Sequence, residues 1–139
     1  MTTALDSSVI LDVLTGDPRW ADASEISLRK VFSEGSVIIG ESVLAEITPA
    51  LPPGEIDRFL SEWKLKFVPS SQASARLAGE MYRVYLQRKG GAKRVLPDFL
   101  IASHALCHAD RLLARDRGYY RDYFADLSLI QPILDHREK

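Results

Sequence analysis

Short apolar runs alternate with longer amphipathic segments along the whole chain. The run Val37-Ile38-Ile39, for example, is β-branched and lies between Gly35 and Gly40, which is typical of a strand buried on both faces. By the same criteria we predict strands at residues 2–6, 37–39, 65–68, 112–114 and 127–130. These segments have the length of ordinary strands and are too short to be helices.

The segments between these strands carry apolar residues at helical spacing. We predict helices at residues 7–14, 20–34, 42–47 and 55–63, a long helix capped by Ser70 or Ser71 and ended by Gly90-Gly91, and a helix with Pro97 in its first turn. Strands that alternate with helices favour a parallel sheet covered on both faces. The predicted fold class is α/β, a three-layer α/β/α arrangement around a mostly parallel sheet of about five strands, with residues 1–139 as a single domain.

Composition narrows the cellular setting. The 139 residues are 46% hydrophobic and 27% charged, as in ordinary globular domains that form a core without disulfides. No apolar run approaches the roughly 20 residues that span a bilayer, and the first residues lack the pattern of a signal peptide. We therefore expect a cytoplasmic protein without a membrane segment, in which Cys107, the single cysteine, is a buried and inert thiol.

Charge is distributed unevenly although the net charge is only -1. Residues 1–62 hold 11 acidic and 4 basic side chains, and residues 63–139 hold 8 acidic and 14 basic ones. Such asymmetry fits contact with a polyanion such as a nucleic acid, and equally fits a domain that pairs its own halves or docks onto a partner.

Four of the 19 acidic residues are predicted to meet at one edge of the sheet. Asp6 closes the first strand, Asp116 follows the fourth, and Glu46 lies about one turn into the helix after the second strand. Asp98 opens the helix that leads into the fourth strand and runs antiparallel to it, so its start lies beside that strand's end. The carboxyl ends of parallel strands are where ligand sites form.

Each acid also has an ordinary structural explanation. Asp6 fits the N-cap of the first helix, Asp98 a favourable charge in a first turn, Asp116 a loop residue, and Glu46 a solvated helix flank. Clustered carboxylates repel one another unless a cation offsets them, so their common location indicates a metal site. Oxygen ligands suit Mg²⁺, with Mn²⁺ as an alternative, and a phosphodiester is the natural substrate.

Four blocks resemble the successive motifs of PIN-domain nucleases, especially the VapC-type toxins, and together they span nearly the whole chain. They are Ala4-Leu5-Asp6-Ser7-Ser8-Val9-Ile10-Leu11, Glu41-Ser42-Val43-Leu44-Ala45-Glu46-Ile47, Val95-Leu96-Pro97-Asp98-Phe99-Leu100-Ile101-Ala102-Ser103-His104-Ala105 and Leu112-Leu113-Ala114-Arg115-Asp116-Arg117-Gly118-Tyr119-Tyr120. The resemblance implies a PIN-like fold and a Mg²⁺-dependent endoribonuclease, the toxin of a VapBC-type toxin-antitoxin system.

In that family the acidic positions, here Asp6, Glu46, Asp98 and Asp116, serve catalysis. Asp6, Asp98 and Asp116 hold the metal, and Ser7 or Ser8 assists. The resemblance further implies an RNA substrate, a VapB-type antitoxin and a homodimer. The family often has Thr or Ser two residues before the last aspartate, where this chain has Ala114, and this departure predicts lower activity or its loss.

Basic residues near the predicted site are candidates for RNA contact. They are Arg83, Arg88, Lys89, Lys93, Arg94 and Arg115. The first five equally fit a solvated helix end. Arg115, with Arg117 on the other side of Asp116, either steers the substrate or only balances the acidic cluster.

Other chemistry is weakly supported. His104 and His108 are four residues apart on a helix but lack the glutamate of a zinc protease motif, and we expect ordinary packing. A non-catalytic PIN-like module that binds protein or RNA stays open as the alternative function. A phospho-acceptor domain is disfavoured because Ser8 stands where a second aspartate would be expected after Asp6.

Overall fold

The computed structural model describes residues 1–89, 95–116 and 118–134, with Lys89 described only through its backbone. Its strands are β1 (Thr2–Leu5), β2 (Ser36–Ile39), β3 (Lys66–Phe67), β4 (Arg111–Leu113) and β5 (Leu129–Ile130). Its helices are α1 (Ser7–Thr15), α2 (Ala21–Glu34), α3 (Glu41–Ile47), the 3-10 helix η1 (Thr48–Ala50), α4 (Ile56–Trp63), α5 (Gln72–Lys89), α6 (Leu96–His108) and α7 (Tyr119–Tyr123).

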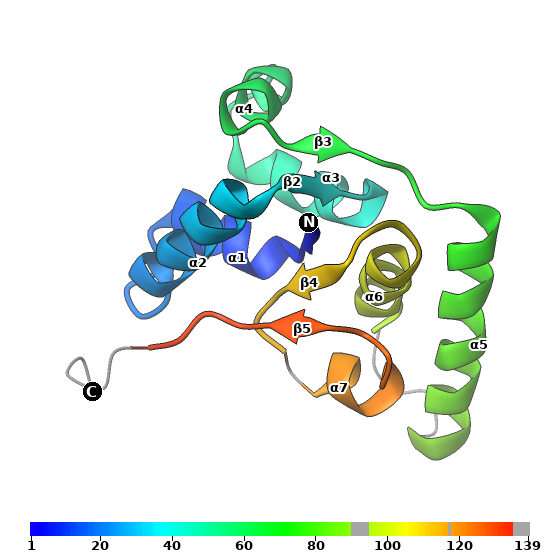
Figure 1. The fold of residues 1–139 in the computed structure, drawn as a ribbon. Helices are drawn as coiled ribbons and strands as arrows, with labels where there is room; N and C mark the ends of the chain where they lie inside the picture. Colours follow the sequence, from blue (N-terminus) through cyan, green and yellow to red (C-terminus); the bar gives the residue numbers. More distant parts are fainter. Residues whose placement is uncertain (90–94, 117, 135–139) are drawn as a thin grey trace.

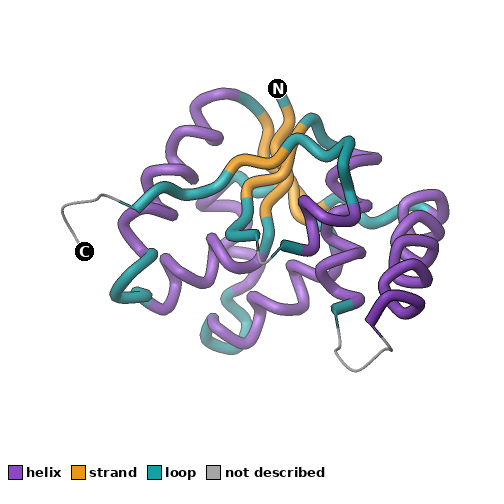
Figure 2. Tube along the Cα trace, turned by 90° about the horizontal axis from the view of Figure 1, so that it is seen from below, coloured by secondary structure: helices purple, strands orange, loops and turns teal. Residues whose placement is uncertain are grey.

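The sheet has the order β3-β2-β1-β4-β5, and every strand pair in it is parallel. Helix α2 contacts β2 on one side of the sheet, while α6 contacts β1 and β4 on the other and packs against α5 (Figure 1). Figure 2 shows the strands gathered between the helices. The predicted three-layer α/β/α fold with a parallel sheet is confirmed.

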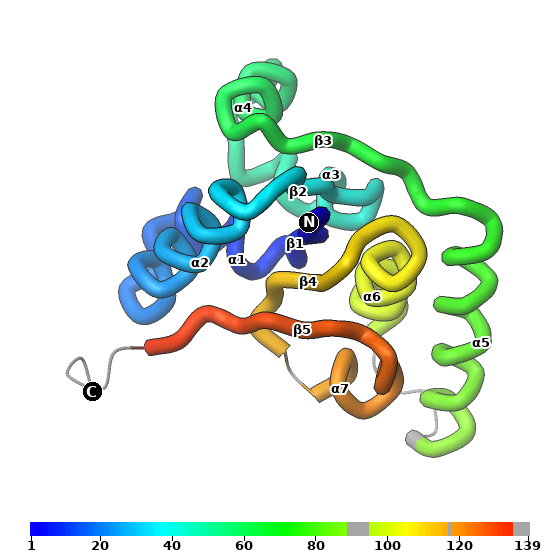
Figure 3. Tube along the Cα trace, viewed as in Figure 1, coloured from blue at the N-terminus to red at the C-terminus, as the bar shows by residue number. Residues whose placement is uncertain are grey.

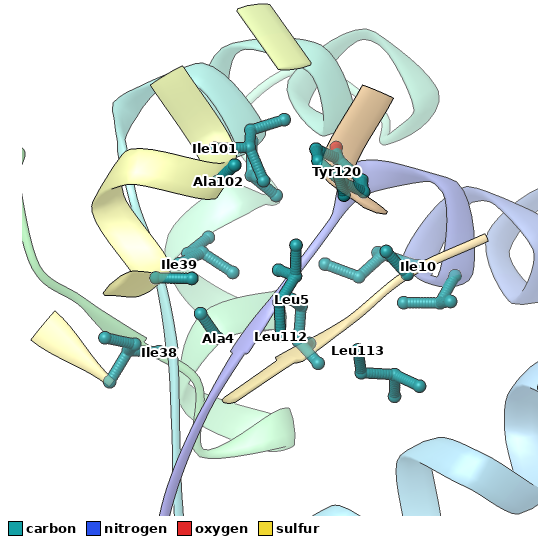
Figure 4. Close-up of a cluster of buried hydrophobic side chains, with 14 of the residues drawn as sticks. Ala4, Leu5, Ile10, Ile38, Ile39, Ile101, Ala102, Leu112, Leu113 and Tyr120 are labelled. Atoms are coloured by element: carbon teal, nitrogen blue, oxygen red, sulfur yellow. The ribbon is translucent and has the colours of Figure 1, made fainter. Parts of the chain in front are cut away.

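Strand β1 is the centre of the sheet, between β2 and β4 (Figure 3). Its register sets Ala4 opposite Ile38 on one side and Leu112 on the other. Ala4, Leu5 and Leu112 are almost fully buried, and they belong to one hydrophobic core cluster with Ile101 and Ala102 of α6 (Figure 4). Because all the strands are parallel, the carboxyl ends of β1, β2 and β4 open onto the same edge.

Most predicted elements are present, with differences at the sheet edges and near the C-terminus. The strand predicted at residues 65–68 is reduced to two exposed residues, because β3 is an edge strand with a neighbour on one side only. The 3-10 helix η1 and the short helix α7 are not apparent from hydrophobic periodicity, since neither is long enough to show a helical repeat.

Two details of the predictions are settled by local contacts. Ser71 rather than Ser70 caps α5. The Ser71 hydroxyl accepts a hydrogen bond from the backbone N–H of Ser74 at 3.1 Å, and the Ser74 hydroxyl accepts one from the backbone N–H of Ser71 at 2.9 Å.

The prediction for Cys107 is wrong, because the thiol is exposed. Cys107 lies in the last turn of α6, after the last buried residue of that helix, Ala105.

In the described part of the chain, no helix combines the length and the apolarity that a membrane span requires.

Among the described residues, two ion pairs join an acid of the first half to an arginine of the second: Glu34 with Arg111 at 2.7 Å and Asp12 with Arg115 at 2.8 Å. Part of the charge asymmetry therefore serves contacts within the fold itself.

Candidate active site

A polar pocket of about 190 Å³ opens at the carboxyl edge of the sheet. The residues that line it are Asp6, Ser7, Ser8, Leu11, Glu46, Asp98, Arg115, Asp116, Tyr119 and Tyr120. All four predicted acidic residues and both predicted serines are thus brought together, from β1 and α1, from α3, from α6 and from the loop after β4. A parallel sheet produces this convergence because its strand ends share one edge.

Asp6 is the most buried of these acids, with 6% of its surface exposed. It occupies the N-cap position of α1, but its side chain makes no capping hydrogen bond. Instead, the Ser8 hydroxyl donates to Oδ2 at 2.5 Å and the Tyr120 hydroxyl donates to Oδ1 at 3.1 Å. Burial raises the pKa of Asp6 above its ordinary value of 3.8, and these two hydroxyls offset part of the rise. The N-cap explanation therefore does not account for this side chain.

Tyr120 is a site residue that the sequence analysis did not identify as functional. Its side chain is 3% exposed, and burial, followed by the negative charge of Asp6, raises the pKa of its hydroxyl far above the ordinary value. The hydroxyl therefore stays protonated and acts as a hydrogen-bond donor to Asp6. A tyrosine in a short helix 114 residues away in sequence gives no signal from spacing or composition.

Asp116 is held differently, by main-chain groups of its own loop. Its Oδ1 accepts hydrogen bonds from the backbone N–H of Gly118 at 2.8 Å and of Tyr120 at 3.2 Å, and its Oδ2 accepts one from Arg121 at 3.2 Å. The carboxylate thus caps the first turn of α7. Tyr120 links two of the acids, since its N–H contacts Asp116 and its hydroxyl contacts Asp6.

Glu46 and Asp98 complete the acidic lining. The Ser7 hydroxyl donates to Oε1 of Glu46 at 3.1 Å, so the two serines serve different acids. Asp98 lies in the first turn of α6, directly after Pro97 at the start of that helix. This is the position expected from a helix that runs antiparallel to β4. Glu46 and Asp98 each make a further interaction, so neither is free.

The chemistry of the donor set fits a hard divalent cation. Carboxylate and hydroxyl oxygens line the pocket, and the buried Asp6 carboxylate lies where a cation would offset the cost of its charge. Among the described residues, however, no three His, Cys, Asp or Glu side chains are grouped closely enough to form a ready metal site. Binding a cation through three of these carboxylates would therefore require them to lie closer together than they do in this structure.

The pocket also contains a positively charged side chain, Arg115, which forms an ion pair. Nη2 of Arg115 lies 2.8 Å from Oδ1 of Asp12, and its guanidinium carbon lies 4.9 Å from the centre of the Trp20 ring. The backbone N–H of Arg115 donates to the Ser8 hydroxyl at 3.3 Å. Neither Asp12 nor Trp20 was identified from the sequence, because an acid on one helix and an aromatic just before the next look like ordinary amphipathic positions.

The other predicted RNA-binding residues fall into two groups. Arg83 is exposed and pairs with Glu80 at 3.3 Å, and the guanidinium of Arg88 lies 5.3 Å from the centre of the Tyr123 ring. Neither is among the described residues that line the pocket. The side chain of Lys89, and Lys93 and Arg94 altogether, lie outside the part of the chain that the structure describes.

The histidine pair has a structural environment, as expected. Nε2 of His104 lies 2.6 Å from the carbonyl oxygen of Val68, and its ring packs against Gly40 and against His108. Burial lowers the pKa of His104. This ring joins α6 to the ends of β2 and β3, close to the start of the helix that carries Glu46.

The fold matches those of chains in solved VapBC and FitAcB structures. VapBC2 from Rickettsia felis, bound to a DNA fragment from its promoter, contains a chain with a TM-score of 0.69 and 24% identity, over 97% of this chain and 100% of that one. FitAcB from Neisseria gonorrhoeae gives 0.63 and 21%, over 92% and 96%. VapBC-1 from nontypeable Haemophilus influenzae gives 0.66 and 15%, over 94% and 98%.

No protein-family profile and no curated protein sequence matches the chain. The structural likenesses show that it has the same fold as the matched chains of the VapBC2, FitAcB and VapBC-1 structures. Fold and pocket together define an α/β/α protein with an acidic site at the carboxyl ends of its parallel strands.

Proposed function

We propose that the protein is a divalent-metal-dependent endoribonuclease, the toxin component of a VapBC-type toxin-antitoxin system. The observation that carries the proposal is the convergence of Asp6, Glu46, Asp98 and Asp116 in one polar pocket. The match in fold to chains of VapBC and FitAB complexes agrees with it. The proposal rests on the pocket, because function on a given fold has to be argued from the site itself.

In this proposal Asp6, Asp98 and Asp116 hold Mg²⁺ or Mn²⁺, with Glu46 beside them. When bound, the cation neutralises charge at the phosphodiester and activates water for in-line attack on phosphorus. The chain's own groups prepare the site: Ser8 and Tyr120 fix the orientation of the Asp6 carboxylate, and Ser7 does the same for Glu46. The pocket's single described arginine, Arg115, is a candidate contact for a phosphate of the RNA backbone.

The test is cleavage of a mixed pool of structured RNA by purified protein, with Mg²⁺ or Mn²⁺ and with EDTA. Asp98→Asn is the inactivating variant. Asp57→Asn is its matched control, because Asp57 also lies in the first turn of a helix, α4, and is exposed. We expect metal-dependent cleavage by wild type and Asp57→Asn, and a loss of at least about 100-fold in folded Asp98→Asn.

Equal cleavage by all three proteins would reveal a contaminating nuclease and count against the proposed site.

The toxin role is tested separately. Expression of this chain alone should arrest growth, and co-expression with the product of the adjacent reading frame should relieve the arrest. Sedimentation of the purified chain tests the proposed homodimer.

A non-catalytic module that binds protein or RNA is the second candidate. Two observations favour it: the Asp116 carboxylate is engaged by three main-chain N–H groups, and Ala114 stands at a fully buried position where the resembled family often has a hydroxyl. Isothermal calorimetry separates the candidates. Binding of Mn²⁺ that is lost in Asp98→Asn supports the nuclease, whereas no metal binding together with no cleavage supports the module.

A further inference from the structure

Arg115 shares the pocket with four carboxylates, yet its ion pair is with a fifth. Asp12 is not among the described residues that line the pocket, and it is 3% exposed. An arginine beside clustered carboxylates ordinarily pairs with them, because charge-assisted hydrogen bonds of this kind are strong. The pairing with Asp12 therefore keeps the guanidinium from neutralising the acids of the pocket.

Asp12 is itself firmly held. It lies on α1, and its Oδ2 accepts a hydrogen bond from the hydroxyl of the fully buried Ser24 on α2 at 2.6 Å, while Oδ1 faces Arg115. A carboxylate this buried is costly without a partner, so both contacts fix its position. Helices α1 and α2 pack against each other, so the hydrogen bond between Asp12 and Ser24 lies within a helix–helix interface.

Trp20 holds the guanidinium from a second direction. The guanidinium carbon of Arg115 is 4.9 Å from the centre of the indole ring, within the range of a cation–π contact. One third of the side chain remains exposed, and Nε is buried without a hydrogen-bond partner among the described residues. The arginine is thus oriented and still has donor capacity, which suits the recognition of an oxyanion.

We infer that Asp12, with Trp20, is a positioning residue that holds Arg115 away from the site carboxylates and presents it to a phosphate of the RNA backbone. The inference rests on the proposed nuclease function. It predicts two separable effects of Asp12. The pairing withholds the guanidinium of Arg115 from the pocket acids, and it orients the arginine for the substrate.

The experiment uses the full chain as wild type, Asp12→Asn, Arg115→Ala and the double variant, each checked for folding by thermal melting. Calorimetry without RNA measures the affinity for Mn²⁺. In Asp12→Asn the released Arg115 competes with the cation for the pocket acids, so we expect the Kd for Mn²⁺ to rise about tenfold. In Arg115→Ala no competing cation is present, and the Kd should not rise.

The double variant gives the decisive comparison. It removes the ion pair as a whole, and its Mn²⁺ affinity should match that of Arg115→Ala. A rise in Kd that persists in the double variant would mean that Asp12 acts on the pocket through packing, and would overturn the inference. Ser24→Ala provides a structural reference, because it removes one contact of Asp12 while the charge of Asp12 and its ion pair with Arg115 remain, and it should raise the Kd for Mn²⁺ by less than Asp12→Asn does.

Cleavage kinetics at saturating Mn²⁺ test the RNA contact. Arg115→Ala and Asp12→Asn should raise KM for RNA about tenfold, and the dependence of log KM on log salt should be shallower by about 0.7, the value for one phosphate contact on a single strand. Arg19→Ala is the matched control: Arg19 also lies over Trp20, at 5.6 Å, but is exposed and is not among the described residues that line the pocket. It should change neither quantity.

The outcomes separate this inference from the proposed function. A wild type that neither binds Mn²⁺ nor cleaves RNA contradicts the nuclease, and the inference falls with it. A wild type that does both, with Asp12→Asn indistinguishable from it, overturns the inference alone. If Asp12→Asn does not fold, Asp12→Glu replaces it. The longer side chain should displace the guanidinium and shift both quantities in the same direction by less.

Discussion

The acidic side chains at the two ends of the parallel sheet have different partners. At the amino end, Arg111 pairs with Glu34 at 2.7 Å and donates through Nε to the Thr3 hydroxyl at 2.9 Å, and Asp110 accepts from the backbone N–H of Thr2 at 2.7 Å. At the carboxyl end, hydroxyl and amide groups contact Asp6, Glu46 and Asp116, while Arg115 is engaged by Asp12.

At the amino end Arg111 pairs with Glu34, whereas the described arginine of the acidic pocket, Arg115, pairs with Asp12 outside the pocket lining. Clustered carboxylates destabilise a fold, so the arrangement at the carboxyl end suits a site where a bound cation supplies positive charge. We therefore expect the two ends to respond to the removal of a charged side chain with opposite changes in stability.

Asp6→Asn should give the largest effect, with opposite signs for activity and stability. Activity should fall by about 1,000-fold, as expected when a metal ligand is lost. In EDTA, however, the variant should melt a few degrees higher than wild type, because the buried charge is gone. Equal or lower stability of the folded variant in EDTA would contradict this description of the carboxyl end.

Asp6 should also make the thermal stability of the metal-free protein depend on pH. Burial raises the pKa of Asp6 in the fold, so folding favours its protonated form. The corresponding stabilisation is fully present below the unfolded-state pKa and is lost as pH rises through the higher folded-state pKa. Melting of metal-free wild type should show this decline, and Asp6→Asn should not.

Arg111→Ala tests the amino end. Its side chain is 13% exposed, and its loss removes an ion pair and leaves the largely buried Thr3 hydroxyl without this partner. We expect the free energy of unfolding to fall by about 2 kcal/mol. Urea denaturation measures the change, while kcat of the folded protein should be unaltered, and a large change in kcat would break the comparison.

Tyr120→Phe removes a single hydroxyl at the carboxyl end. The loss of its hydrogen bond to Asp6 should lower the free energy of unfolding by about 1 kcal/mol. It should also raise the pKa of Asp6 further, since that hydroxyl lowers it. Metal competes with protons for the carboxylate, so the pH at which Mn²⁺ binding is half lost should move upward. Calorimetry across a pH series checks this, with Tyr123→Phe as the control.

Arg83→Ala should give the smallest effect. Arg83 and Glu80 form an exposed pair three residues apart on α5, and such pairs contribute about 0.3 kcal/mol. Stability should therefore hardly change in urea denaturation. If Arg83 contacts RNA, KM for RNA should rise and its salt dependence should become shallower, whereas identical kinetics would remove it from the candidate RNA surface.

The sequence was most informative where periodicity and topology act together. Apolar runs and helical spacing predicted the alternation of elements, and the shared edge of parallel strands predicted that Asp6, Glu46, Asp98 and Asp116 meet. Their catalytic and metal-binding roles stay predictions. Hydrogen bonds between distant residues were beyond such reasoning, because the pairing of Tyr120 with Asp6 or Arg115 with Asp12 depends on the packing of side chains.

The same limit explains the error at Cys107 and the missed helix α7. Cys107 belongs to an apolar stretch of the sequence, but its exposure depends on the packing around the last turn of α6. Helix α7 has five residues, too few for a repeat, and it begins where the Asp116 carboxylate meets its N–H groups.

The central place of β1 has a consequence for the order in which the molecule acquires its parts. β1 is made before its partner β4, which follows about a hundred residues later, and the contacts of Asp6 with Tyr120 and of Asp12 with Arg115 span 114 and 103 residues. A growing chain on the ribosome carries Asp6 long before Asp116 exists. The acidic pocket is thus assembled only after the segment that follows β4 has been synthesised, and a shortened chain that lacks β4 has neither this pocket nor a complete sheet.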